Sequence, residues 1–170
     1  MQDREALLIE VPMDKRTNKT TSLTSHAYDE LPEDIRSLIS RAKKAAEKAH
    51  APYSNFMVGA ALLLEDGNIL TGNNQENAVF PAGICAERVA LTYAHANWPH
   101  IKPLKIAVVA RRRDKENYAF VTPCGICRQT LTEYEQKFGS AIEIYMLGPD
   151  DQVLTAAGVD DLLPFKFSDF

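Results

Sequence analysis

The chain has 170 residues, a length that favours one compact domain with a sizeable hydrophobic core. Hydrophobic residues make up 45% of it and charged residues 25%, which are ordinary values for a soluble globular protein. The net charge of −4 argues against a general nucleic-acid-binding protein, because such proteins neutralise phosphates with clustered Lys and Arg side chains.

The first half of the chain predicts a helix followed by a hairpin. Residues 1–30 are mixed: "EALLIEVP" at 5–12 is a candidate short strand, and "TNKTTSLTS" at 17–25 indicates a polar loop. A helix is expected after Pro32, because apolar residues recur with the spacing of one buried face through residue 49. Two apolar stretches, 57–64 and 68–72, flank "EDGN", whose Asp66-Gly67 pair is typical of a tight turn.

The second half predicts helices that alternate with strands. A helical stripe lies in "GICAERVALTYAHAN" at 83–97, a buried strand at 104–110, and another helix begins near Pro123. Strand 142–147 precedes a terminal strand and short helix within residues 153–167. Together these elements predict an α/β fold, a three-layer α-β-α sandwich built on a mixed five-stranded sheet.

The N-terminus shows no basic start followed by a long apolar segment, so we expect no signal peptide and a cytoplasmic location. The longest apolar run, "VGAALLL" at 58–64, is too short to span a membrane. In a reducing compartment, clustered cysteines are more often metal ligands or catalysts than disulfides. The chain has three cysteines, an odd number that also speaks against internal pairing.

The three cysteines fall at the predicted starts of two helices. Cys85 opens "CAER", and "PCGIC" places Cys124 and Cys127 at i and i+3, on one side of a first helical turn. If the two helix starts face each other, three sulfurs converge on one point. Three protein ligands and one open position are typical of catalytic zinc, whereas structural zinc usually has four protein ligands.

Two neighbours of Cys85 extend this hypothesis from a metal site to an active site. Glu87 follows Cys85 by two positions, so it points away from the ligand face and can approach a water on the metal without binding the metal. A carboxylate there can move protons between water and substrate. We assign Arg88 to hydrogen-bonding a coordinating sulfur, a supporting role that metal ligands commonly require.

C-x-E followed by P-C-x-x-C is the pattern of zinc-dependent deaminases. From residue 51 to residue 167 the chain resembles the cytidine deaminase family, specifically its small enzymes that act on free nucleosides. The matching stretches are "YSNFMVGAAL", "GNNQENAVFPAGICAERVAL", "TPCGICRQTL" and "LLPFKF". The resemblance implies a catalytic domain at residues 31–170, preceded by an extension at residues 1–30 about which it says nothing.

The resemblance also implies a binding site for a nucleoside. Asn74 and Glu76 match the family's sugar-binding residues, and Phe56 matches an aromatic side chain that packs against the pyrimidine. Phe80 would line the same pocket, and the backbone of Ala86 would contact the base. Gln75 departs from the family, which usually has an aliphatic residue there.

Other implied roles concern the metal and the assembly. Each subunit would hold one Zn²⁺ through Cys85, Cys124 and Cys127, with Gln129 supporting the thiolates. Phe167 matches a terminal aromatic residue that enters a neighbouring subunit's active site, which implies a homotetramer with shared active sites.

The expected reaction is the hydrolytic deamination of cytidine and 2′-deoxycytidine in pyrimidine salvage, with no nucleic-acid or membrane partner. Glu87 would move protons between water, ring N3 and the leaving amine. Three alternatives stay open: a deaminase of another aminopyrimidine nucleoside such as blasticidin S, a polynucleotide editor, and a non-catalytic zinc-stabilised assembly module.

Overall fold

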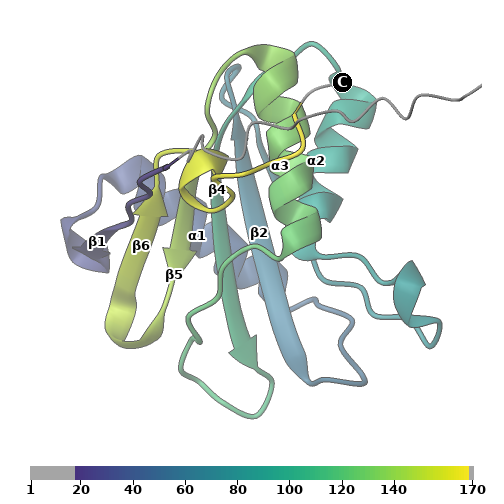
Figure 1. Ribbon diagram of the computed structural model, residues 1–170. Helices are drawn as coiled ribbons and strands as arrows, with labels where there is room; N and C mark the ends of the chain where they lie inside the picture. Colours follow the sequence, from purple (N-terminus) through teal and green to yellow (C-terminus); the bar gives the residue numbers. More distant parts are fainter. Residues whose placement is uncertain (1–17, 169–170) are drawn as a thin grey trace, which may run out of the picture.

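The computed structural model describes residues 18–168, so the candidate strand at residues 5–12 lies outside the described part. Three helices and six strands form this part of the chain, together with short 3-10 turns (Figure 1). The helices are α1 (Glu33–Ala46), α2 (Ala86–Asn97) and α3 (Gly125–Phe138). The strands are β1 (Thr24–Ala27), β2 (Phe56–Leu64), β3 (Ile69–Asn73), β4 (Pro103–Arg112), β5 (Glu143–Leu147) and β6 (Gln152–Ala156).

The sheet has six strands in the order β1-β6-β5-β4-β2-β3, so the prediction of five strands is wrong. The additional strand is β1, which begins in the last two residues of the segment that the sequence indicated as a polar loop. It pairs antiparallel with β6, and the Ser25 hydroxyl donates to Gln152 Oε1 at 3.2 Å. Because β1 is a largely exposed edge strand, its residues lack the alternation of apolar and polar side chains that reveals a half-buried strand.

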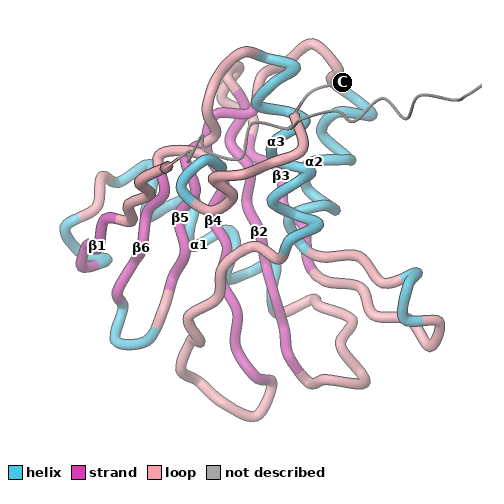
Figure 2. Tube along the Cα trace, viewed as in Figure 1, coloured by secondary structure: helices cyan, strands magenta, loops and turns pink. Residues whose placement is uncertain are grey.

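The three-layer α/β arrangement is confirmed. Helix α1 covers one face of the sheet, and α2 and α3 cover the other (Figure 1). Only the β4–β5 pair is parallel, and α3 forms the connection between these strands; the other pairs are antiparallel (Figure 2). None of the helices among residues 18–168 is long and apolar enough to cross a membrane.

Two glycines on the β2–β3 hairpin let a helix approach each face of the sheet closely. A Cβ atom on Gly59 of β2 would lie 2.1 Å from the Ala42 carbonyl oxygen of α1. On the opposite face, a Cβ atom on Gly72 of β3 would lie 2.3 Å from the Ala86 carbonyl oxygen, in the first turn of α2. The backbone of α2 therefore sits directly on Gly72, at the end of the helix that carries Cys85 and Glu87.

Candidate active site

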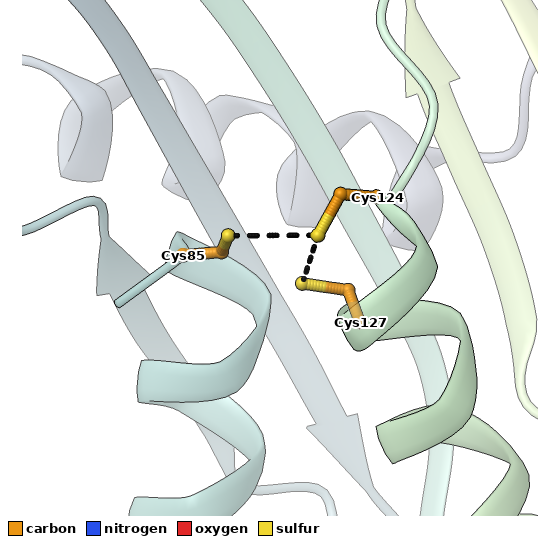
Figure 3. Close-up of side chains that lie close together, drawn as sticks. All are labelled: Cys85, Cys124 and Cys127. Carbon is orange, nitrogen blue, oxygen red and sulfur yellow. Dashed lines mark hydrogen bonds between the residues drawn. The ribbon is translucent and has the colours of Figure 1, made fainter. Parts of the chain in front are cut away.

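The starts of α2 and α3 lie side by side and bring three thiols together (Figure 3). Cys85 and Cys124 are the residues that immediately precede the two helices, and both have an extended backbone. Cys127 lies in the first turn of α3 and is buried. The Sγ atoms of Cys85 and Cys124 are 3.8 Å apart, and those of Cys124 and Cys127 are 3.6 Å apart. The predicted convergence of three sulfurs is thus present.

The spacing of these sulfurs fits a tetrahedral zinc ion. Zn–S bonds of about 2.3 Å at tetrahedral angles place two sulfurs about 3.8 Å apart. The three Sγ atoms lie within 4.8 Å of one another, and all three cysteines are free thiols. They can therefore hold a zinc ion. Among residues 18–168 this is the one group of three or more Cys, His, Asp or Glu side chains close enough to do so.

The thiols influence one another electrostatically. A hydrogen bond from the Cys127 thiol lowers the pKa of Cys85 to about 6, against the opposing effects of burial and of Glu87. The same interaction, together with burial, raises the pKa of Cys127. A thiolate is the form of cysteine that binds metals, and Cys85 is thus already close to that form at neutral pH.

Glu87 is one of two buried polar or charged side chains among the described residues, with 4% of its surface exposed. Burial raises the pKa of its carboxyl group, and hydrogen bonds and the nearby Arg88 only partly oppose that shift. A raised pKa favours the protonated form of the carboxyl group, which suits a group that must take up and hold a proton as a general acid and base does.

Two adjacent hollows meet at this site. The inner pocket, of about 230 Å³, is lined by Phe56, Glu87 and Cys124 among others. The outer pocket, of about 480 Å³, is lined by residues that include Glu76 and Phe80. Asn74 and Cys85 line both pockets, so the two hollows are direct neighbours.

The two predicted sugar-binding side chains hold the backbone that carries Phe56. Asn74 accepts a hydrogen bond from the Val58 amide at 2.8 Å and donates to the Phe56 carbonyl oxygen at 2.9 Å. Glu76 accepts from the backbone amides of Tyr53 and Ser54 at 2.8 and 3.3 Å and from the Ser54 hydroxyl at 2.5 Å. These bonds, that from Ser54 first, lower the pKa of Glu76.

The remaining predicted residues lie at or near these pockets. Ala86 is fully buried in the inner pocket wall, and Phe80 is 75% exposed at the outer pocket. Arg88 is half-buried in the first turn of α2 and helps to lower the pKa of Cys85. Gln129 donates to the Phe167 carbonyl oxygen at 2.8 Å, which fastens the C-terminal segment to α3. The roles assigned to Gln129 and Phe167 stay predictions.

The sequence analysis missed Arg128, which holds the turn before Cys124 in place. Its guanidinium group donates to the Pro123 carbonyl oxygen at 2.7 Å, to Thr122 Oγ1 at 2.8 Å and to the Leu162 carbonyl oxygen at 2.6 Å. Its partner at Leu162 is 34 positions distant along the chain. No local pattern could have indicated that contact.

We expect Arg128→Ala to lower the free energy of unfolding by about 3 kcal/mol, because two carbonyl groups and a hydroxyl lose a charged donor. Zinc affinity should fall as well, since the turn before Cys124 loses its support. Arg128→Lys should recover little, because an ammonium group cannot reproduce the planar fork. Urea unfolding and zinc competition would measure both effects. Arg112→Ala, which removes an exposed pair with Asp114, is the matched control and should change neither.

Comparisons with known proteins agree with this geometry. Residues 32–139 match the family described as "Cytidine and deoxycytidylate deaminase zinc-binding region". A cytidine deaminase of Sporosarcina psychrophila is 41% identical over 138 residues, which cover 79% of this chain and 92% of that protein. One from Halalkalibacterium halodurans is 39% identical, with 79% and 95% covered. A crystal structure of cytidine deaminase from Burkholderia pseudomallei superposes with a TM-score of 0.67 at 39% identity, covering 78% of this chain and 98% of that one.

Proposed function

Because the chain belongs to the cytidine and deoxycytidylate deaminase family, we propose that it hydrolyses cytidine and 2′-deoxycytidine to uridine and 2′-deoxyuridine, with release of ammonia. The observation that carries the proposal is the buried carboxyl group of Glu87 in the same pocket as Cys85 and Cys124. A module that only assembles around zinc has no need of that carboxyl group, whose burial is costly.

In this proposal Cys85, Cys124 and Cys127 hold one Zn²⁺ per subunit. The bound metal would supply a water that is acidic enough to act as a nucleophile near neutral pH. Arg88 would partly neutralise the negative charge of the three thiolates, and Gln129 would help to hold the thiolates in place. The positive charge of Arg88 makes a small contribution to the lowered pKa of Cys85, after the larger one of the Cys127 thiol, and this is compatible with that role.

Glu87 performs the proton transfers. It takes a proton from the attacking water and delivers it to ring N3. It then takes the proton of the new C4 hydroxyl group and passes it to the amine, so that the C4–N bond breaks and the C4 carbonyl group forms. Burial raises the pKa of this carboxyl group, which favours its holding a proton between the two transfers. The oxygen atom of water thus replaces the amino group at C4, so the products are uridine and ammonia.

The inner pocket would hold the pyrimidine, between Phe56 and the backbone at Ala86, and the outer pocket would hold the sugar beside Phe80. After its bonds to the backbone, the Asn74 amide retains one N–H and one lone pair, and Glu76 Oε1 retains acceptor capacity. One donor and one acceptor suit a single hydroxyl group, which both accepts and donates. We therefore propose that the enzyme recognises one sugar hydroxyl, the 3′-hydroxyl that both substrates share.

This polar arrangement favours a nucleoside whose sugar carries a 3′-hydroxyl group over other aminopyrimidine compounds. The net charge of −4 disfavours a polynucleotide, which requires a basic surface. We place the enzyme in the cytoplasm, in pyrimidine salvage, since three reduced thiols at one site suit a reducing compartment.

We further propose a homotetramer in which Phe167 reaches a neighbouring active site. Large apolar side chains are exposed around the outer pocket, among them Val79 at 65% and Phe80 at 75%. Phe167 is 68% exposed at the end of the segment fastened to α3. Exposed apolar side chains gathered around one site are typical of surfaces that a partner covers.

Three nucleosides that differ in their sugar hydroxyl groups test the proposed recognition of the 3′-hydroxyl. Cytidine and 2′-deoxycytidine should give kcat/KM values within about threefold of each other, whereas 3′-deoxycytidine should fall by about 10²-fold or more, because Asn74 and Glu76 lose their shared partner. Equal rates for all three would contradict the proposed hydroxyl recognition. A 2′-deoxycytidine rate as low as that of the 3′-deoxy compound would contradict the proposed pair of substrates.

A further inference from the structure

The hydroxyl group of Ser54 lies at the junction between the sugar-binding and base-binding parts of the site. It donates to Glu76 Oε1 at 2.5 Å and accepts a hydrogen bond from the Phe56 amide at 3.0 Å. Ser54 and Glu76 line the outer pocket, and Phe56 lines the inner one. One hydroxyl group thus connects the carboxylate proposed to read the sugar with the residue proposed to pack against the pyrimidine.

These bonds add to two backbone hydrogen bonds in the same turn, from the Asn55 amide to the Ala51 carbonyl oxygen at 3.1 Å and from the Arg113 amide to the Asn55 carbonyl oxygen at 2.8 Å. Between Ser54 and Phe56 the chain passes through Asn55, whose φ of 55° lies in the left-handed region. Non-glycine residues adopt that conformation at an energetic cost unless surrounding contacts hold them there. The bond from the Phe56 amide to Ser54 Oγ spans Asn55 and closes this turn. Beyond the turn, Phe56 begins β2.

Asn74 fixes the other side of Phe56, because its side-chain amide donates to the Phe56 carbonyl oxygen at 2.9 Å. Phe56 is therefore held at its amide by Ser54 and at its carbonyl group by Asn74. The two bonds differ in their support, however. The Asn74 side chain also accepts a hydrogen bond from the Val58 amide of β2, whereas the Ser54 hydroxyl group that accepts from Phe56 lies in an exposed turn and is oriented by its donation to Glu76.

We propose that Ser54 is a specificity-determining positioning residue that sets the orientation of the Glu76 carboxylate and the placement of Phe56 together, an inference that rests on the proposed function. When the Ser54 hydroxyl group is removed, Glu76 Oε1 loses its donor and the Phe56 amide loses its acceptor, while the two backbone amides still donate to Glu76 Oε2. The sugar and the base are then bound less well, while Glu87 and the three cysteines keep their places. Ser54 therefore acts on nucleoside binding and not on the proton transfers.

Steady-state kinetics with cytidine would test this inference in three variants. Ser54→Ala should raise KM about fivefold to tenfold and leave kcat within about twofold, because a charge-assisted hydrogen bond is lost outside the reacting groups. Ser54→Thr retains a hydroxyl group and should restore most of the wild-type KM. Ser25→Ala removes an exposed side-chain hydrogen bond far from the site and should match the wild type.

Amide hydrogen exchange supplies a readout that needs no activity. The Phe56 amide should exchange faster in Ser54→Ala than in the wild type, while zinc content stays equal. An unchanged KM, or a fall in kcat with zinc loss, would overturn the inference, as would a Phe56 amide that exchanges as slowly as before. If the wild type itself formed no uridine, the proposed function would fail with it, and the exchange result would still show whether Ser54 holds Phe56.

Discussion

Glu87→Gln lowers kcat for cytidine by on the order of 10³-fold, which is the expected loss when a general acid and base is removed. Glutamine retains the size and the hydrogen-bonding oxygen of glutamate, but it cannot carry a proton from water to N3 and then to the amine. Because Glu87 is not a proposed metal ligand, the variant should bind zinc and unfold like the wild type. Uridine formation, zinc content and urea unfolding measure these three properties.

A second glutamate provides the control. Glu133→Gln makes the same chemical change on the exposed surface of α3, away from the pockets, and should leave kcat unchanged. If Glu87→Gln bound zinc and remained as active as Glu133→Gln, Glu87 would not be the proton carrier.

Gly72→Ala should disrupt both the fold and the metal site. The added Cβ atom would lie 2.3 Å from the Ala86 carbonyl oxygen and 2.8 Å from the Ala90 amide nitrogen, and both are backbone atoms. The start of α2 must then move away from the sheet and take Cys85 with it. We expect the free energy of unfolding to fall by about 3 kcal/mol and zinc affinity to fall about tenfold or more.

The matching change on the opposite face separates these two effects. In Gly59→Ala the new Cβ atom would lie 2.1 Å from the Ala42 carbonyl oxygen, so α1 must move instead of α2. The loss of stability should be similar, but zinc affinity should stay close to that of the wild type, because α1 carries no proposed metal ligand. Competition with a coloured chelator measures the affinity. Equal zinc losses in both variants would show that Gly72 acts only through general stability.

The features that the sequence predicts correctly depend on residues that are close together in the chain. The face of α1 repeats with helical spacing, and the Asp66-Gly67 pair forms the predicted hairpin turn, with Gly67 at a φ of 86°. The Asp66 carboxylate accepts from the Asn68 amide, which closes that turn. The convergence of Cys124 and Cys127 follows from their i, i+3 spacing, since neighbours on a helix must meet.

The features that it does not predict depend on distant partners. Strand β1 forms because its backbone pairs with the open edge of β6, and its own residues show no alternation of apolar and polar side chains. The contact from Arg128 to Leu162, and that from Gly72 to the start of α2, join residues that no spacing rule connects. In the same way, the hydrogen bonds that Glu76 accepts from Tyr53 and Ser54 join two loops that are separate in the sequence.

The most direct measurement is the ultraviolet spectrum of cytidine incubated with the zinc-loaded wild-type protein, with release of ammonia assayed in parallel. We expect conversion to uridine with one ammonia per nucleoside, and loss of that conversion when zinc is removed by a chelator and its return when zinc is restored. A folded, zinc-loaded protein that left cytidine unchanged would contradict the proposed function.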